Sequence, residues 1–201
     1  MSSGTVDRSG CIIRSAQNAD AAVVSEIYAP FVRDSFVSFE EEPPGAAEMA
    51  RRINSATCWL VLESSGEVQG YAYAVPFRTR HAYQWSVEVS VYVRAAFHGR
   101  GAGRSLYMAL FSCLRLMGYH RALAGITLPN PASVAIHERL GFEKVGVFEQ
   151  VGYKLGAWRD VGWWNLKLVD TPSAPVPPRK WTDVCDTSAV RDALALAATP
   201  T

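Results

Sequence analysis

Three glycines lie close together where a strand pattern gives way to a helix pattern: Gly99, Gly101 and Gly103. Before them, residues 87–93 alternate valine with other residues, which is typical of a β-strand. After them, apolar residues recur at helical spacing as far as Met117. A glycine-rich turn between a strand and a helix lets the backbone approach a ligand closely and presents N–H groups at the positive end of the helix dipole. Phosphate is the ligand that suits this arrangement.

The spacing excludes two common phosphate motifs. A P-loop needs a glycine five residues before Gly103 and a lysine after it, but His98 and Arg104 occupy those positions. A dinucleotide fingerprint that began at Gly99 would need a third glycine at position 104. The candidate contacts to phosphate are the consecutive residues His98, Gly99, Arg100, Gly101, Ala102, Gly103 and Arg104.

A second block of chemistry-bearing residues follows a short apolar strand pattern at residues 122–126. It consists of Asn130, Ser133 and His137, followed by the pair Gly141-Phe142. Ser133 is a natural N-cap for a short helix that Gly141 would end. The helix would carry His137, which could be a proton donor or a histidine bonded within the core.

Together the two blocks resemble the GNAT superfamily of acyl-CoA-dependent N-acyltransferases. The family's pyrophosphate loop has Gln or Arg, two residues, Gly, one residue, then Gly or Ala; Gly101 and Gly103 match the small positions, and His98 stands where Gln or Arg is usual. The resemblance implies an α/β (α+β) fold with a central, mixed, mostly antiparallel twisted sheet. That sheet is splayed at the acyl-CoA site and flanked by helices.

The resemblance also implies roles for individual residues. Asn130 and Ser133 would contact the CoA arm, and the backbone of Val91 and Val93 would pair with the pantetheine. His137 stands where many members carry a tyrosine that protonates the departing thiolate.

Longer segments are similar to the phosphinothricin N-acetyltransferase family, which includes methionine sulfoximine and methionine sulfone acetyltransferases. The similarity covers roughly residues 12–168 and includes the stretches YAYAVPFRTRHAYQWSVEVSVYV and GYKLGAWRDVGWWNLKL. It implies transfer from acetyl-CoA to the α-amine of a small amino acid or analogue, directly in a ternary complex. Relatives are commonly homodimers, so a homodimer is expected by resemblance.

Glu88 is the candidate general base. An amine that is mostly protonated at neutral pH must lose a proton before it attacks a thioester, and a nearby carboxylate can take that proton. Glu88 lies between Val87 and Val89 in the strand pattern, where a charge is out of place if both sheet faces are covered. The alternative is a solvated carboxylate, but the resembled family has its proposed base at this position.

The remaining site candidates concern the acceptor. Arg78 and Arg80 precede the strand and could bind a substrate carboxylate, although Arg78 could equally be a solvated surface residue. Phe36, Phe39 and Tyr83 could line the pocket, although aromatic residues more often belong to the core.

Two other functions remain open from the sequence. The same fold could acetylate another amine, such as a polyamine, an aminoglycoside or a protein N-terminus; the run Glu40–Glu42 would suit a polyamine, whereas Arg78 and Arg80 argue against one. The chain could also be a non-catalytic acyl-CoA sensor. His98 favours a sensor, and the retained Glu88 opposes it.

Composition narrows the class further. The 201 residues are 49% hydrophobic and 19% charged with a formal net charge of +1, which gives no electrostatic basis for binding nucleic acid or an anionic membrane. No apolar run is long enough to span a membrane, and the N-terminus lacks a secretory pattern. The four cysteines are scattered, so free thiols in a reducing cytoplasm are expected. No cluster has metal-ligand spacing, so no metal is expected.

The elements that must position these residues can be outlined from the pattern. We expect strands at 11–14, 58–63, 68–75, 122–126, 142–149 and 161–168, with a loop at 150–160. We expect helices from Asn18 or Asp20 to near Pro30, and at 46–54. The domain prediction is a flexible tail at 1–10, a catalytic domain at 11–170, and a proline-rich linker with an appendage at 171–201 that is ordered only against a partner.

Overall fold

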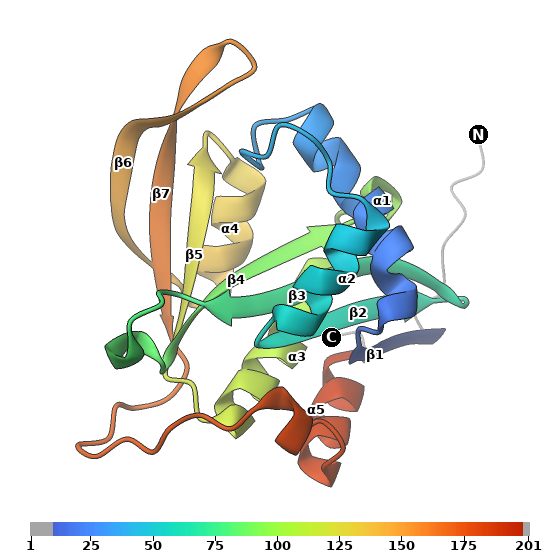
Figure 1. The fold of residues 1–201 in the computed structure, drawn as a ribbon, viewed down its shortest axis with the longest axis vertical. Helices are drawn as coiled ribbons and strands as arrows, with labels where there is room; N and C mark the ends of the chain where they lie inside the picture. The colour runs from blue at the N-terminus through green and yellow to red at the C-terminus, as the bar shows by residue number, and fades with distance from the viewer. Residues whose placement is uncertain (1–9, 199–201) are drawn as a thin grey trace.

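The computed structural model describes residues 10–198 and contains one seven-stranded sheet (Figure 1). Its spatial order is β1-β2-β3-β4-β5-β7-β6. The strands are β1 (Cys11–Ser15), β2 (Cys58–Ser64), β3 (Glu67–Pro76), β4 (Ser86–Val93), β5 (Arg121–Leu128), β6 (Glu143–Lys154) and β7 (Ala157–Lys167). Neighbouring strands are antiparallel except β4 and β5, which are parallel. The predicted mixed, mostly antiparallel sheet is confirmed.

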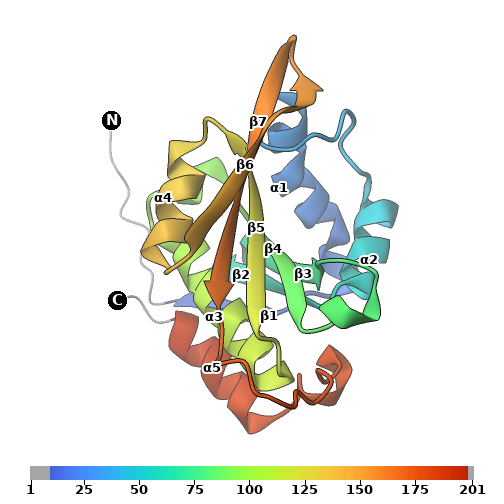
Figure 2. The same cartoon turned by 90° about the vertical axis from the view of Figure 1, so that its left-hand side faces the viewer.

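Five α-helices of the described part of the chain flank the sheet. They are α1 (Ala21–Arg33), α2 (Ala46–Ser55), α3 (Ala102–Met117), α4 (Pro131–Arg139) and α5 (Ser188–Ala198). Helices α1 and α2 pack on one face of the sheet, α3 and α5 pack on the other, and α4 lies beside β5 (Figures 1 and 2). The central strands of the sheet are therefore buried on both faces, which explains the apolar runs in β2 and β3.

The sheet divides between β4 and β5. The two strands pair over only three positions, Ser86–Arg121, Val87–Ala122 and Glu88–Leu123, and then diverge. Beyond this contact the β5-facing edge of β4 has no neighbouring strand in the described sheet. A gap opens there, with β4 on one side and β5 and α4 on the other.

Helix α3 starts at the mouth of this gap. Its apolar residues Leu106, Ala109, Leu110, Cys113 and Leu114 are all fully buried, as their helical spacing predicts. The helix ends at Gly118, whose φ of +96° and N–H bonds to two preceding carbonyls form a left-handed C-cap.

Helix α1 differs from the sequence prediction at its C-terminal end. It was expected to end near Pro30 but continues to Arg33, with Pro30 inside it. Proline has no N–H, so the carbonyl of Glu26, four residues earlier, lacks the helical hydrogen bond that another residue at position 30 would donate. Both Pro30 and Glu26 are exposed. Water can therefore hydrate that carbonyl, which lowers the cost of the missing hydrogen bond.

The predicted loop at 150–160 is wrong. Strands β6 and β7 continue through it and form a long hairpin that turns at Leu155-Gly156 and projects beyond the rest of the sheet (Figure 2). Register shifts between Lys144 and Gly146 and between Phe148 and Gly152 interrupt the alternation that would have revealed the strand.

The C-terminal segment packs within the same chain, so the prediction that it is ordered only against a partner is wrong. Val184 and Val190 are buried in the cluster that contains α3, and the indole N–H of Trp181 donates to Ser15 Oγ at 3.0 Å. The predicted tail at 1–10 lies almost entirely outside the described residues.

Candidate active site

Backbone groups of β4 form one wall of the gap between β4 and β5. Arg94 N–H bonds Gln69 O on β3 at 2.8 Å, so the backbone groups of the even-numbered residues of β4 point towards β3. Because these groups alternate along a strand, those of Val91 and Val93 point into the gap. They suit an extended ligand that carries its own amides, as the sequence predicts for these two residues.

The glycine-rich turn closes one end of the gap. Gly99 and Gly101 have φ values of +71° and +79°, which glycine adopts without strain. The first intrahelical bond runs from Ser105 N–H to Gly101 O, so the N–H groups of Ala102 and Gly103 lie ahead of it at the positive end of α3. These donors suit a pyrophosphate.

Gly103 is required for close packing at this end. A Cβ there would lie 3.1 Å from Ile136 Cδ1 on α4 and 3.9 Å from Val91 Cγ2 on β4. The absence of a side chain therefore lets α3, α4 and β4 converge beside the gap.

The side chains around the turn have separate placements. His98 Nε2 lies 2.8 Å from Val93 O, so its ring links the turn to the end of β4. The guanidinium of Arg100 lies 5.4 Å from the centre of the Phe97 ring, and Arg104 is exposed on the first turn of α3.

Asn130 and Ser133 both line the gap, but their capping roles differ from the prediction. Asn130, not Ser133, is the N-cap of α4, and its side-chain oxygen accepts a hydrogen bond from Ser133 N–H at 3.1 Å. Asparagine is among the best N-cap residues, and Pro131 suits the first helical position that follows it.

His137 lies in the wall of the gap with only 4% of its surface exposed. Its Nδ1 lies 2.7 Å from the backbone oxygen of Ser133 and its Nε2 lies 3.0 Å from the hydroxyl of Tyr107. A carbonyl can only accept, so Nδ1 carries the proton, and in the neutral ring Nε2 accepts from Tyr107. Burial lowers the pKa of His137, which keeps the ring neutral.

Tyr107 is a functional candidate that the sequence analysis missed. It belongs to the apolar stripe of α3 and is fully buried, yet it lines the gap and its hydroxyl bonds His137. Tyr107 lies three residues before Leu110, which is the spacing of an ordinary core residue on this helix. Only its contact with His137 on another element indicates a functional role.

Glu88 lies at the closed end of the gap, at the last residue pair that joins β4 to β5. Its side chain is half-buried, and burial raises the pKa of the carboxyl, while the positive charge of Arg78 partly offsets that rise. A carboxylate whose pKa lies above the usual range is closer to the pKa of a base that works at neutral pH.

The segment before β4 carries the predicted cations. Arg78 stacks its guanidinium over Phe77 at 4.1 Å, and Tyr83 packs edge-on against the same ring at 6.0 Å. Arg80 is exposed at the start of a short 3-10 turn (His81–Tyr83). Arg78 is thus within electrostatic range of Glu88, whereas Arg80 projects from the exposed part of this segment.

The loop between α1 and α2 reaches the gap and is held by the β6–β7 hairpin. Val37 lines the gap, Phe36 lies under the guanidinium of Arg159 at 4.1 Å, and Phe39 packs on Gly152. The structure therefore brings Phe36 and Phe39 to the hairpin. Arg159 was missed because residues 150–160, which form the outer part of the hairpin, were predicted as a loop. Val37 was missed because only contacts between distant segments place it at the gap.

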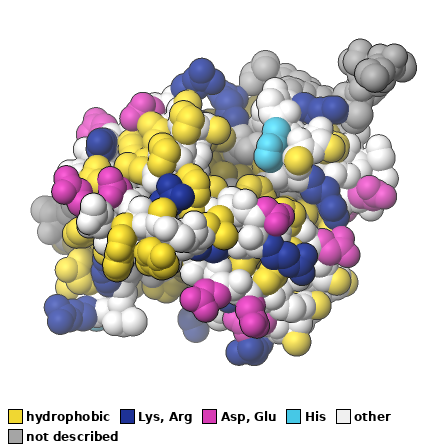
Figure 3. All heavy atoms as spheres, turned by 90° about the horizontal axis from the view of Figure 1, so that it is seen from above, with side chains coloured by type: hydrophobic (Ala, Val, Ile, Leu, Met, Phe, Trp, Pro, Cys, Tyr) yellow, Lys and Arg dark blue, Asp and Glu magenta, His cyan; other side chains and the backbone are white. Residues whose placement is uncertain are grey.

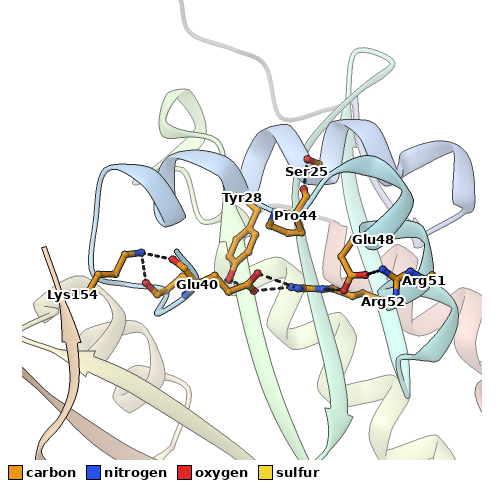
Figure 4. A network of polar contacts seen from close by, with 9 residues as sticks. Ser25, Tyr28, Glu40, Pro44, Glu48, Arg51, Arg52 and Lys154 are labelled. Carbon is orange, nitrogen blue, oxygen red and sulfur yellow. Dashed lines mark hydrogen bonds and ion pairs between the residues drawn. The ribbon is translucent and has the colours of Figure 1, made fainter. Parts of the chain in front are cut away.

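A polar network behind this loop fixes it to α1 and α2 (Figure 4). Arg52 donates two hydrogen bonds to the carboxylate of Glu40, at 2.7 and 3.0 Å, and Tyr28 donates a third at 3.0 Å. Arg52 also bonds Glu48 at 2.8 Å. These contacts lower the pKa of Glu40 despite its partial burial, so Glu40 is committed to structure.

The site is a gap between two parallel strands, with a glycine-rich helix start at one end and a half-buried carboxylate at the other. These features define the active site of a group-transfer enzyme with a phosphate-bearing donor. Comparison with known proteins identifies the group. The family model described as acetyltransferase (GNAT) domain matches residues 13–163, and the chain belongs to that family. It is an N-acetyltransferase whose acyl donor is acetyl-CoA.

Named relatives agree with this family. The chain is 38% identical over 175 residues to a phosphinothricin N-acetyltransferase of Streptomyces viridochromogenes, covering 86% of this chain and 95% of the relative. It is 36% identical over 168 residues to an L-methionine sulfoximine/L-methionine sulfone acetyltransferase of Pseudomonas paraeruginosa, covering 81% and 98%.

A solved structure extends the similarity to three dimensions. A phosphinothricin acetyltransferase from Sinorhizobium meliloti in complex with acetyl-CoA matches with a TM-score of 0.78 at 33% identity. The match covers 89% of this chain and 99% of the other. Within residues 10–198 there is no group of three or more His, Cys, Asp or Glu side chains that could hold a metal, and no helix long and apolar enough to cross a membrane.

Proposed function

We propose that this enzyme transfers the acetyl group of acetyl-CoA to the α-amine of a small amino acid or analogue of the phosphinothricin or methionine sulfoximine/sulfone type. The observation that carries the proposal is the half-buried Glu88 at the closed end of the gap, with the positive charge of Arg78 close by. The carboxylate can take a proton from the amine, and the cation can attract the substrate's own carboxylate. The names of the relatives support this acceptor class.

The donor is assigned to the gap. The pantetheine amides pair with the backbone of Val91 and Val93, and the pyrophosphate binds at residues 98–104 and the start of α3. Asn130 and Ser133 contact the arm from the α4 side. In this assignment the phosphate contacts come chiefly from backbone N–H groups, because the His98 ring is bonded to Val93 O.

The chemistry is a direct transfer. Glu88 takes a proton from the ammonium, either directly or through a water molecule, and the amine nitrogen attacks the thioester carbonyl. The N–C bond forms, the C–S bond breaks, CoA leaves as a thiolate with the electron pair, and the second proton of the attacking nitrogen passes to that thiolate or to solvent to leave the neutral amide. A thiol pKa of about 8.5 allows departure without full protonation.

His137 is assigned a role through Tyr107. Because the His137 proton is on Nδ1 and faces the Ser133 carbonyl, the Nε2 atom of His137 accepts the O–H of Tyr107, and neither ring nitrogen offers a proton to the gap. His137 then orients that hydroxyl.

The acceptor side is assigned to residues from three segments. Arg78 and Arg80 bind the substrate carboxylate, while Phe36, Phe39 and Tyr83 form walls of the pocket. The pairing of Glu40 with Arg52 and Tyr28 counts against an acidic site for a polyamine.

The experiment is release of free thiol from acetyl-CoA in the presence of phosphinothricin, methionine sulfoximine, methionine sulfone, ordinary amino acids and a polyamine. We expect saturable release with the amino-acid analogues and none above background with the polyamine. Release with the polyamine alone, or bound acetyl-CoA with no release for any acceptor, contradicts the proposal.

We further propose a cytoplasmic homodimer. All four cysteines are free thiols, which suits a reducing compartment. The β6–β7 hairpin carries exposed apolar side chains, including Val145, Phe148, Val151, Tyr153 and Trp158. Hydrophobic side chains gather on the surface seen from the hairpin end of the molecule (Figure 3). A second copy of the chain would cover such a surface.

A further inference from the structure

Lys154 lies at the end of β6, and its ammonium group is enclosed by three backbone carbonyls. Its Nζ donates to Val32 O at 2.6 Å, Ser38 O at 2.6 Å and Glu40 O at 2.7 Å. Figure 4 shows the Lys154 side chain pointing towards the segment that carries Glu40. An ammonium group has three N–H donors, so each donor has one acceptor. None of the site assignments above uses this lysine.

The three carbonyls belong to the two ends of one segment. Val32 lies in the last turn of α1, and Ser38 and Glu40 lie in the loop that leads to α2. Lys154 thus ties the end of a helix and the far side of the loop to the hairpin. Phe36 and Val37 lie between these attachment points, and Val37 lines the gap.

The same loop is held from behind at Glu40. The backbone oxygen of Glu40 accepts from Lys154, while its carboxylate accepts from Arg52 and Tyr28. Tyr28 in turn packs edge-on against Tyr92, with ring centres 4.8 Å apart, and Tyr92 lines the gap. A continuous set of contacts therefore connects the hairpin ammonium to the wall of the active site.

We propose that Lys154 is a positioning residue that holds the α1–α2 loop in the conformation that forms the acceptor pocket. The inference rests on the proposed function, because that function assigns Phe36 and Phe39, on the same loop, to the amine side of the site. It requires both the charge and the shape of lysine. A planar guanidinium cannot direct its donors to three carbonyls that converge on one point, and methionine keeps the apolar stem without a donor.

The test is Lys154→Met, with Lys144→Met as the matched control on the same strand. Lys144 is exposed, and its ammonium lies 5.9 Å from the Trp164 ring. If the variant leaves the loop in its competent conformation about a tenth of the time, KM for the amine rises about 10-fold. We expect KM for acetyl-CoA to stay within about twofold and kcat to change less than the amine KM. Lys144→Met should match the wild type in all three.

Rescue separates charge from bulk. In Lys154→Cys, the thiolate displaces bromide from 2-bromoethylamine and forms a thioether side chain that ends in an ammonium at the length of lysine. We expect this treatment to restore the amine KM to within about threefold of the wild type. The wild type is treated in parallel, since Cys11 and Cys185 are partly exposed.

A readout independent of turnover keeps this test separate from the proposed function. Chymotrypsin should cut at Phe36 or Phe39 faster in Lys154→Met than in Lys144→Met, because the loop opens locally more often. An unchanged amine KM with unchanged cleavage overturns the inference. Equal rises in KM for both substrates would show a general loss of structure and overturn it too. Absence of acetylation by the wild type, with accelerated cleavage in Lys154→Met, overturns the proposed function and leaves the loop attachment supported.

Discussion

At the scale of single residues, the active site depends on opposed effects on one carboxyl group. Burial raises the pKa of Glu88, and the charge of Arg78 acts in the opposite direction. If the charge of Arg78 is removed, only the effect of burial on the pKa of Glu88 remains. Arg78 therefore adjusts the pH at which Glu88 becomes a base. This role is separate from any contact that Arg78 makes with a substrate carboxylate.

Arg78→Ala should shift the acidic limb of the pH profile of kcat/KM to higher pH. Glu88 must be deprotonated to accept a proton, so activity rises as pH passes its pKa, and loss of the neighbouring cation raises that pKa further. The measurement is kcat/KM for methionine sulfone across pH 4–8. Arg78→Lys keeps the charge and should return the limb towards the wild-type position. An acidic limb that stays in place in Arg78→Ala contradicts the assignment of Glu88 as the titrating base.

His137 shows why a histidine in the right sequence position need not act as an acid. Burial lowers its pKa, the Ser133 carbonyl fixes its proton on Nδ1, and Tyr107 occupies Nε2. Sequence reasoning can place a histidine on a helix, but the tautomer depends on groups from other elements.

At the scale of elements, the start of α3 combines backbone geometry and ligand chemistry. Gly101 is the N-cap of α3 and has a φ of +79°. The same left-handed conformation occurs at Gly66, where φ is +80°, in the turn between β2 and β3. The two positions impose the same backbone requirement, but only Gly101 adjoins the proposed phosphate site.

Gly101→Ala and Gly66→Ala should therefore be destabilising to a similar degree, by about 1–2 kcal/mol each. Only Gly101→Ala should raise KM for acetyl-CoA, by about 5-fold or more, because a shift of the turn displaces the N–H donors of α3. Denaturant unfolding and steady-state kinetics measure the two effects. A similar change in KM in both variants would mean that the turn acts on the donor only through overall stability.

The same elements show how much of the fold and site follows from the sequence. Strands β2, β3 and β4 and helix α3 were predicted because their apolar residues recur at one period and glycine or polar residues bound them. The register shifts in β6 and the polar residues Gln150 and Lys154 concealed the continuation of that strand beyond residue 149, and Pro30 concealed the end of α1. Residues of the glycine-rich turn could be proposed from spacing, whereas Tyr107, Val37 and Lys154 depend on contacts between distant segments. Such contacts leave no periodic signal.

At the scale of the whole molecule, the β6–β7 hairpin carries more of the exposed large hydrophobic side chains than any other element within residues 10–198. Phe148 is 60% exposed and Trp158 is 60% exposed, although the same hairpin contacts the α1–α2 loop through Lys154, Gly152 and Arg159. In the proposed homodimer, the hairpin would thus transmit the position of the partner subunit to the acceptor pocket.

Phe148→Glu should shift the protein towards the monomer in light scattering coupled to size-exclusion chromatography. A buried carboxylate without a partner is costly at an apolar interface. Val176→Glu is the matched control, because Val176 is 81% exposed and lies in the C-terminal segment, away from the hairpin. It should keep the mass of the wild type. A wild type that is monomeric at micromolar concentration, or a Phe148→Glu variant that stays dimeric, contradicts the hairpin interface.

The short contact between β4 and β5 has a mechanical consequence for catalysis. Within the described sheet, the part from β1 to β4 and the part from β5 to β7 meet at three residue pairs, and Glu88 belongs to the last of them. If the two parts rotate relative to each other, the far ends at Val93 and Leu128 sweep the largest arcs. Glu88, beside the pivot, is displaced least. The gap can therefore widen or narrow around a donor of some length while the carboxylate keeps nearly the same position relative to both half-sheets.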